Sequence, residues 1–194
     1  FQSSTYRIER GQPYEKARYA RGNNTPNHLV LGEKIASLEN AEASVVTSSG
    51  MAAICAALLT VCRGGDHVLA QANLYGGTYT LLKSELPRLD VTHTMVRLPD
   101  PDTWKKALTP KTKVFYVESI STPGLDVPDF KSVVAFCKEH NLVSIIDNTI
   151  ATPFNFRPMD VGFDISIHSA TKYLNGHSDI IAGCVISTRA MIEK

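Results

Sequence analysis

The chain has 194 residues, of which 43% are hydrophobic and 20% are charged, and its formal net charge is +1. A chain of this size and composition can bury a substantial core and is typical of a soluble globular protein. The charges form no block of one sign, which excludes an electrostatic basis for binding nucleic acid or an anionic membrane. The longest apolar run, at residues 51–61, is too short to span a bilayer, so we expect no membrane role.

The four cysteines are scattered through apolar stretches and form no CxxC pair. Free cysteine in such a setting behaves as a small buried hydrophobe, which indicates reduced core thiols and a cytoplasmic location. The six histidines show no spacing that is typical of a metal site. We therefore predict neither disulfides nor a bound metal.

Residues 1–27 have the pattern of an arm rather than of a packed element. Glycines and prolines interrupt every period, yet the segment carries three tyrosines and four arginines. Because a free tail rarely contains so many aromatic residues, we expect this arm to lie on another surface. The alternative is an unstructured terminus, which is common at chain ends.

From residue 28 onward, short apolar runs alternate with amphipathic stretches. Strands are predicted at residues 43–47, 67–71, 91–96, 113–118, 142–146 and 165–168. Helices are predicted at 28–39, 102–108 and 130–139. Two further helices are predicted, one that begins at Met51 and one that ends near Pro87. This alternation predicts an α/β fold of three layers, in which helices cover both faces of a mostly parallel sheet.

Polar side chains follow several of these strands directly. They are Ser48–Gly50, Glu118, Asp147 and Ser169–Lys172. Ligands of parallel sheets collect at the carboxyl ends of the strands, so we expect these groups to share one site. The turn at Ser48–Gly50 opens into a helix and could bind a phosphate through free backbone amides, although small residues at such a junction more often serve packing.

Lys172 lies just past the 165–168 strand, between Thr171 and a polar turn that a second apolar run, 180–186, follows. Alone, it could neutralise a bound phosphate, and Asp147 could be a metal or phosphate ligand or a loop cap. Pyridoxal phosphate would use both residues, because it needs a lysine for its aldehyde and an anion for its pyridinium nitrogen. The Gly50 and Met51 amides with the Ser169 and Thr171 hydroxyls could bind its phosphate.

Four strings carry a resemblance to a known family: SATKYLNGHSD, IIDNT, SSGMAA and NLYGGTY, each weak alone but strong as a collinear set. Together with residues from Tyr19 onward, they are similar to the trans-sulfuration family of pyridoxal-phosphate enzymes, which includes cystathionine γ-synthase, cystathionine γ- and β-lyases, methionine γ-lyase and O-acylhomoserine sulfhydrylases. The resemblance implies an aspartate-aminotransferase-like large domain at 28–194, incomplete at its C-terminal end. It also implies that the family's small C-terminal domain is absent from this chain.

The resemblance implies roles at matching positions. Lys172 would hold the cofactor and carry protons, Asp147 would pair with the ring nitrogen, and Tyr75 would stack on the ring and act as an acid or base. Gly50, Met51, Ser169 and Thr171 would hold the phosphate. Tyr19 and Arg21 would reach the phosphate of a neighbouring subunit, which implies a homodimer or a dimer of dimers built through the arm.

Three positions depart from the family pattern. The segment after Arg21 has altered order and spacing, and Thr122 stands where relatives commonly have an asparagine near the cofactor's 3-hydroxyl. Gly77 stands where methionine γ-lyases typically carry a cysteine, which argues mildly against that specificity. Family members are also roughly twice as long as this chain.

The resulting functional hypothesis is a pyridoxal-phosphate lyase or transferase of the cystathionine γ-synthase and γ-lyase type. It would catalyse γ- or β-elimination or replacement on cystathionine, cysteine or homocysteine derivatives, or O-acylhomoserine. One alternative keeps the cofactor but changes the reaction to transamination or decarboxylation. Another is a non-catalytic phosphate-binding α/β fragment.

Overall fold

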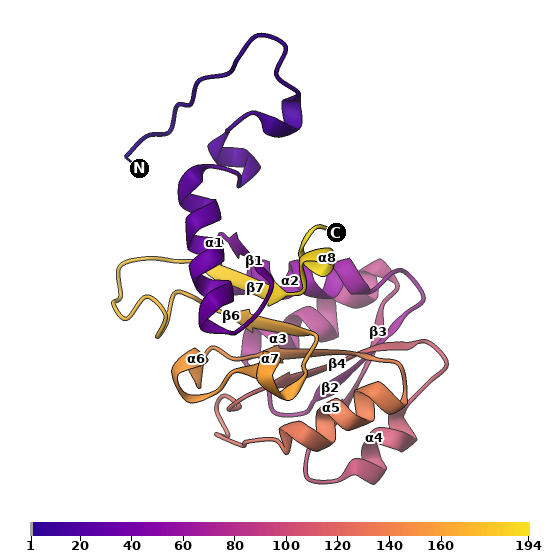
Figure 1. Cartoon of the computed structure of the whole chain (residues 1–194). Helices are drawn as coiled ribbons and strands as arrows, with labels where there is room; N and C mark the ends of the chain where they lie inside the picture. The colour runs from indigo at the N-terminus through magenta and orange to yellow at the C-terminus, as the bar shows by residue number, and fades with distance from the viewer. Residues whose placement is uncertain (1) are drawn as a thin grey trace.

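A seven-stranded sheet organises the computed structural model, which describes residues 2–194 and, among them, every side chain except that of Glu15. The strand order is β1-β7-β6-β5-β4-β2-β3 (Figure 1). The strands are β1 (Ala43–Thr47), β2 (His67–Gln71), β3 (Thr92–Val96), β4 (Thr112–Glu118), β5 (Val143–Asp147), β6 (Ile165–His168) and β7 (Gly183–Ser187).

The sheet is mostly parallel, as the alternation of elements predicts. Neighbours from β3 through β2, β4 and β5 to β6 pair in parallel, and only β7 runs antiparallel to both β6 and β1. Because β7 is antiparallel to both of its neighbours, β1 and β6 point in the same direction. The carboxyl ends of six strands therefore meet at one edge of the sheet, where Glu118 of β4 lies in register with Asp147 of β5.

Helices cover both faces of the sheet (Figure 1). The α-helices are α1 (Pro26–Leu38), α2 (Gly50–Val61), α3 (Gly76–Thr80), α4 (Pro101–Ala107), α5 (Phe130–Glu139), α6 (Thr152–Asn155), α7 (Pro158–Val161) and α8 (Arg189–Ile192). The helix of α3 continues as a π-turn at Leu81–Glu85 and a 3₁₀ turn at Leu86–Leu89. The single-turn helices α6, α7 and α8 were not predicted, because four residues are too few to show a helical period.

Two apolar cores lie on opposite faces of the sheet. On one face, α2 and the α3 segment bury Ile54, Leu58 and Leu82 against the strands. On the other face, Trp104 of α4 packs edge-on against Phe115 and Phe136, with ring centroids 5.2 and 5.5 Å away. These two cores hold the strands rigidly, so the polar groups at the strand ends are presented on a fixed frame.

The four cysteines are unpaired, and three of them are buried. Burial raises the pKa of the Cys62 thiol to about 11 and that of Cys184 to about 12. Such thiols stay protonated at neutral pH and are poor nucleophiles. They therefore pack as core residues, as the sequence indicates.

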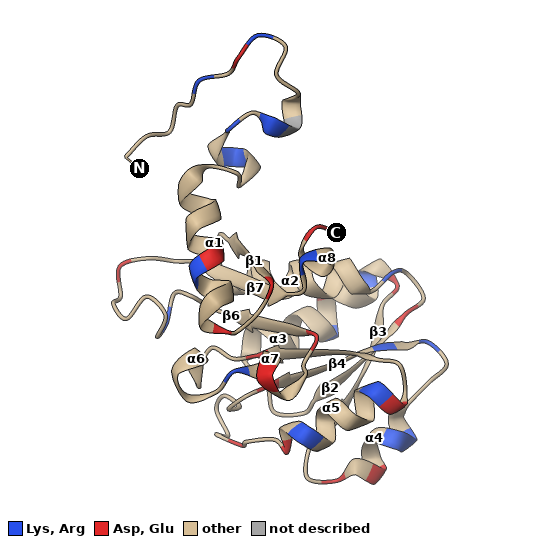
Figure 2. Ribbon diagram, viewed as in Figure 1, with Lys and Arg blue, Asp and Glu red and all other residues tan. Residues whose placement is uncertain are grey.

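The segment before α1 projects from the body of the molecule (Figure 1). It is extended apart from two 3₁₀ turns, Tyr14–Lys16 and Ala20–Gly22, and most of its described side chains are exposed. The Asn23 side chain anchors its base by donating a hydrogen bond to the Val46 carbonyl of β1, at 2.8 Å. Lys and Arg dominate the charges along this segment, whereas both signs mix over α4 and α5 (Figure 2). Its reach to a neighbouring subunit stays a prediction.

Among residues 2–194, no helix has the length and apolar character needed to cross a bilayer. The cytoplasmic location stays a prediction.

Candidate functional site

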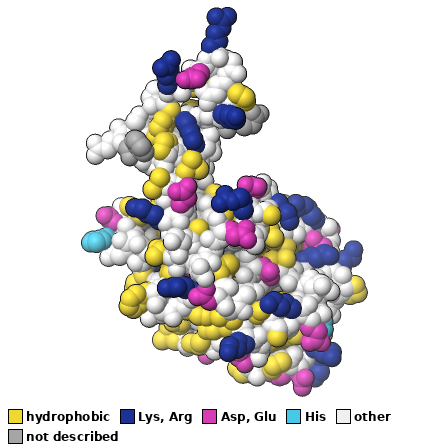
Figure 3. Space-filling model, viewed as in Figure 1, with side chains coloured by type: hydrophobic (Ala, Val, Ile, Leu, Met, Phe, Trp, Pro, Cys, Tyr) yellow, Lys and Arg dark blue, Asp and Glu magenta, His cyan; other side chains and the backbone are white. Residues whose placement is uncertain are grey.

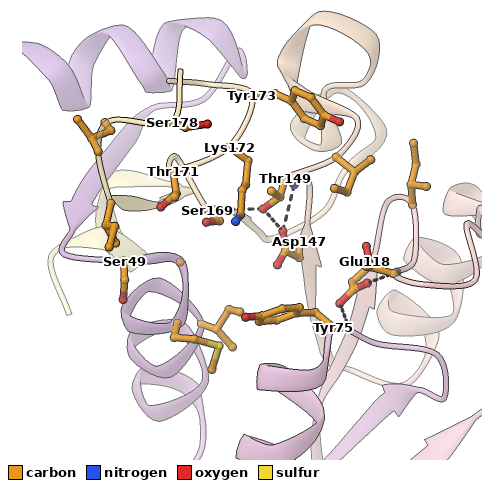
Figure 4. Close-up of a pocket in the computed structure, with 18 of the residues that line it drawn as sticks. Ser49, Tyr75, Glu118, Asp147, Thr149, Ser169, Thr171, Lys172, Tyr173 and Ser178 are labelled. Carbon is orange, nitrogen blue, oxygen red and sulfur yellow. Dashed lines mark hydrogen bonds between the residues drawn. The ribbon is translucent and has the colours of Figure 1, made fainter. Parts of the chain in front are cut away.

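A cavity of about 890 Å³ opens at the shared carboxyl edge of the strands (Figure 4). Cavities of this size are typical of small-molecule and cofactor sites. Seven of the nine predicted site residues line it: Gly50, Met51, Tyr75, Asp147, Ser169, Thr171 and Lys172. The other two, Tyr19 and Arg21, lie outside it, on the projecting segment.

Asp147 ends β5 and turns its carboxylate into the cavity. Its Oδ1 accepts hydrogen bonds from the Thr149 hydroxyl at 2.5 Å and from the Thr149 amide at 3.0 Å. Burial nevertheless raises the pKa of Asp147, and these two bonds oppose the rise only in part. A half-buried carboxylate of this kind gains most from a cationic partner, such as a protonated ring nitrogen.

Thr149 joins Asp147 to the turn that carries Lys172. While its hydroxyl donates to Asp147, its oxygen accepts a hydrogen bond from the Ser169 amide at 2.7 Å. The ends of β5 and β6 are thus connected through one side chain. Sequence reasoning missed this residue, although its place two positions after a strand-end aspartate is the spacing of a local side-chain-to-backbone turn.

Tyr116 of β4 lies beside Asp147. Its hydroxyl lies 3.5 Å from Asp147 Oδ2, in position to donate a weak hydrogen bond. Burial and the charges of Asp147 and Glu118 hold the pKa of Tyr116 well above its usual value, so it remains a donor. No sequence signal marks Tyr116, because within a strand it resembles any other core aromatic residue.

Lys172 lies in the turn after β6, where its amide donates to the Ser169 carbonyl at 3.1 Å. Its side chain points into the cavity toward Thr149 and Asp147 (Figure 4). Within residues 2–194, no carboxylate lies within 4.0 Å of its amine. The amine is therefore open to react with a ligand in the cavity.

The amino end of α2 forms the cavity wall next to the turn that carries Lys172. Ser49 caps this helix by accepting a hydrogen bond from the Ala52 amide at 3.1 Å, which leaves the Gly50 and Met51 amides directed outward. A 12-residue helix presents a partial positive charge there, which favours an anion. Gly50 permits a close approach to the lysine turn, since a Cβ on it would lie 2.6 Å from the Ser169 Cβ.

The two predicted phosphate-binding hydroxyls differ in their surroundings. Thr171 Oγ1 donates to the Ala182 carbonyl and accepts from the Ala182 amide, both at 3.0 Å. Its hydrogen is therefore used within its own loop, and only a lone pair remains. Ser169 Oγ has no hydrogen-bond partner among the described residues, which makes it the better donor to an anion.

Tyr75 precedes α3, and its ring extends across the cavity (Figure 4). The ring is half exposed, as a platform for a planar ligand must be. A Cβ on Gly77 would lie 2.5 Å from this ring and 2.8 Å from Met51 Sδ. Gly77 is thus required for the observed ring position, a role that the sequence comparison with methionine γ-lyases does not reveal.

Glu118 and Thr122 complete the wall beside Tyr75. The Glu118 carboxylate accepts hydrogen bonds from the Tyr75 amide at 2.7 Å and from the Thr122 amide at 3.0 Å. Thr122 also lines the cavity, at the position where the family commonly has asparagine.

These residues fit pyridoxal phosphate in the chemistry of their donors. Asp147 is a half-buried carboxylate that lacks a cationic partner among the described residues, Lys172 is an open amine, and the Gly50 cradle faces the unpartnered Ser169 hydroxyl. Together with the Tyr75 ring they supply a group for each part of that cofactor: its ring nitrogen, aldehyde, phosphate and ring face.

Curated relatives support this assignment. A cystathionine beta-lyase (MetC) of Staphylococcus haemolyticus is 42% identical over 97% of this chain and 48% of its own length. An L-methionine gamma-lyase of Treponema denticola is 42% identical over 87% of this chain and 43% of its own length. The chain therefore spans about half the length of the curated relatives that it matches.

Solved structures of similar proteins have the same fold. Cystathionine gamma-lyase from Lactobacillus plantarum, complexed with L-serine, superposes on the whole chain with a TM-score of 0.91 and 35% identity, covering 50% of that structure. A putative O-acetylhomoserine (thiol)-lyase from Campylobacter jejuni, which contains a pyridoxyl-lysine phosphate, covers 86% of this chain and 41% of its own with a TM-score of 0.83 and 33% identity.

The family described as Cys/Met metabolism PLP-dependent enzyme matches residues 1–194, the full chain. The resemblance to trans-sulfuration enzymes and the expected cofactor are thereby confirmed. The chain belongs to the family of pyridoxal-phosphate-dependent enzymes of cysteine and methionine metabolism.

Proposed function

We propose that this chain carries the cofactor site of a trans-sulfuration enzyme that acts on the β- or γ-carbon of a sulfur amino acid or an activated homoserine. The observation that carries the proposal is the joint position of Lys172 and Asp147 in one cavity, connected through Thr149. The lyases among the relatives support the reaction class. Within it, we propose the cystathionine γ-synthase or γ-lyase type.

Bound pyridoxal phosphate supplies an aldehyde that captures an amino group and a ring that accepts electron density. Lys172 Nζ would hold the aldehyde at rest and, once displaced by the substrate, move protons between substrate carbons. Asp147 would accept a hydrogen bond from the protonated ring nitrogen. The amides of Gly50 and Met51, with the Ser169 hydroxyl, would bind the phosphate.

Tyr75 would stack on the cofactor ring and offer its hydroxyl near the substrate amine. With the cofactor bound, the Tyr75 ring would also exclude water from the ring face that it covers. Exclusion of water strengthens the interactions of Asp147 and Lys172 with their ligands, because the local dielectric constant falls.

Product analysis of the full chain tests the reaction class. Cystathionine, methionine and O-acylhomoserine should be assayed side by side with added pyridoxal phosphate. Release of ammonia and a 2-oxo acid from at least one of them is the expected result, with pyruvate indicating β-cleavage and 2-oxobutyrate indicating γ-cleavage. Amino-group exchange with a 2-oxo acid, or carbon dioxide release, would instead point to a transaminase or decarboxylase. A cofactor that fails to bind would favour the non-catalytic alternative.

Self-association is the second part of the proposal. The projecting segment exposes Tyr19 beside Arg21, whose guanidinium lies 4.2 Å from the Tyr19 ring centroid. Hydrophobic side chains are also exposed where the arm meets the body (Figure 3), including Leu29, Val30 and Leu31 of α1. We propose that this arm delivers Tyr19 and Arg21 to the cofactor phosphate of a second copy, in a homodimer or a dimer of dimers. Sedimentation velocity of the full chain would detect the dimer, and a monomer at all concentrations would refute it.

Gly50→Ala is expected to weaken pyridoxal phosphate binding about tenfold or more, the effect of losing roughly 1.4 kcal/mol. The added Cβ would lie 2.6 Å from the Ser169 Cβ and 3.0 Å from its Cα, so the α2 start and the lysine turn must separate. Titration of the full chain with cofactor, followed by absorbance, measures the dissociation constant. Gly76→Ala is the matched control, since its Cβ would meet nothing within 4 Å. Equal affinities of the two variants would contradict the proposed cradle.

A further inference from the structure

Glu118 is a buried carboxylate that the proposed reaction does not use. It ends β4 with 4% of its surface exposed and lies beside Asp147 in the sheet. Its Oε1 accepts from the Tyr75 amide and its Oε2 from the Thr122 amide, at 2.7 and 3.0 Å (Figure 4). One side chain thereby joins two loops that are 43 and 4 residues away in the sequence.

The position of this carboxylate is itself fixed. The Glu118 amide donates to Gln71 Oε1 at 3.0 Å, and Gln71 Nε2 donates to the Asn73 carbonyl at 2.7 Å. The loop between β2 and α3 is therefore connected to the end of β4 twice, once through Gln71 and once through the Glu118 carboxylate. These bonds fix the position of the carboxylate, so it cannot shift to keep its hydrogen bonds if either loop moves.

Both amides belong to residues that line the cavity. The Tyr75 amide sets the backbone from which the Tyr75 ring extends, since Glu118 is the side chain that accepts from it. The Tyr75 carbonyl accepts from the Tyr79 amide at 3.0 Å, which ties the other side of Tyr75 to α3, and no hydrogen bond holds the Tyr75 hydroxyl to another described residue. The Thr122 amide positions Thr122 in the cavity wall beside Tyr75. Loss of either bond would free a cavity wall while leaving both cores intact.

We infer that Glu118 is a positioning residue of the cofactor site, which holds Tyr75 and Thr122 in place only while its carboxylate is ionised. An ionised carboxylate offers acceptors on both oxygens, whereas a protonated one turns one oxygen into a donor that faces an amide N–H. Protonation thus removes one of the two bonds. The inference rests on the proposed function for its consequence on the cofactor, but not for the geometry.

Burial of Glu118 places this change near neutral pH. Burial raises the pKa of Glu118 to about 7, and the negative charge of Asp147 adds to the rise, while the hydrogen bonds from Tyr75 and Thr122 oppose it. Other titratable or charged groups on the elements around it include Lys113 and Tyr116 on its own strand, Tyr75 before α3, Tyr79 on α3, Lys172 after β6 and Asp126 in the following loop. Glu118 therefore accepts both hydrogen bonds above pH 7, and one of them is progressively lost as the pH falls below 7.

Hydrogen exchange of the full chain, measured without added cofactor between pH 6 and 8.5 and corrected for intrinsic exchange rates, reads both amides directly. We expect protection of the segments containing Tyr75 and Thr122 to fall at least about tenfold in one of them as the pH drops through 7, since one hydrogen bond is lost. Protection of the α5 segments should not change with pH. Protection that is constant with pH in both loops would overturn the inference.

Glu118→Gln removes the titration while preserving size. Its single carbonyl oxygen can accept from one amide only, so one segment should stay about tenfold less protected at every pH. The variant should also bind pyridoxal phosphate at least about tenfold more weakly at pH 8, the effect of about 1.4 kcal/mol. Glu139→Gln makes the same chemical change at the exposed end of α5 and should alter neither measurement.

The two measurements separate this inference from the proposed function. Wild-type affinity of Glu118→Gln at pH 8, or unchanged protection of both loops, would overturn the positioning role. A wild-type chain that binds no pyridoxal phosphate would overturn the proposed function, while exchange would still decide whether Glu118 clamps the two loops.

Discussion

Lys172→Ala is expected to abolish covalent retention of pyridoxal phosphate and to lower the reaction rate by at least roughly 10³-fold, since it removes both a nucleophile and a proton carrier. The Lys172 amine is the lysine amine that the cavity presents to a ligand, and it points toward Asp147 and Thr149. Among the residues that the structure describes, no other lysine lines the cavity to replace it. Borohydride reduction in the presence of cofactor, followed by peptide mass analysis, measures the covalent adduct, and the wild type should carry it on Lys172.

Lys105→Ala is the matched control for this experiment. Lys105 lies on the exposed surface of α4, and its removal should leave cofactor retention and rate unchanged. A Lys172→Ala variant that still gave the reduced adduct would show that another amine holds the cofactor. Weak noncovalent binding by the variant is compatible with the assignment, because the α2 amides and Asp147 remain.

Asp147→Asn is expected to lower the rate at least about 10²-fold and to weaken pyridoxal phosphate binding tenfold or more, because a buried ion pair loses its anion. The amide can still accept from Thr149 through its oxygen, so the local turn should survive. What it lacks is the charge that keeps a ring nitrogen protonated. Rate and dissociation constant are measured with the same titration and product assays as for the wild type.

Without cofactor, the same substitution is expected to preserve or raise the stability of the folded protein. Burial raises the folded-state pKa of Asp147, so the folded protein binds a proton more tightly there than the unfolded chain does. That contribution to stability is present at low pH and is lost as the pH rises through the folded-state pKa. At pH 8, Asp147→Asn should therefore melt at or above the wild-type temperature without cofactor, but gain less when cofactor is added.

Thermal melts with and without cofactor measure both expected effects: the melting temperature of the protein alone and its increase when cofactor is added. Asp102→Asn, on the exposed first turn of α4, should match the wild type in each. If Asp147→Asn gained as much from the cofactor as the wild type does, Asp147 would not be the partner of the ring nitrogen.

Much of the fold could be predicted because each strand is a short apolar run bounded by polar turns. The ranges expected for β1, β2, α5 and β6 coincide with those observed, and those for β3, β4, β5, α1 and α4 differ by one or two residues at an end. The direction of β7 could not be predicted, since an apolar run looks the same whether its strand runs parallel or antiparallel. Its start was also obscured, because Ile180 and Ile181 extend the apolar pattern but lie exposed at the cavity.

The sequence by itself determined which chemical groups end the parallel strands, because strand-end position is local and the side-chain types are printed in the chain. That was enough to pair Lys172 with Asp147 and to indicate the cofactor. Only the tertiary structure decided how those groups are held: Thr149 between β5 and β6, Gly77 under the Tyr75 ring, and Glu118 across two loops. These contacts join residues whose neighbourhood depends on strand order and register, and neither is encoded in any single stretch of sequence.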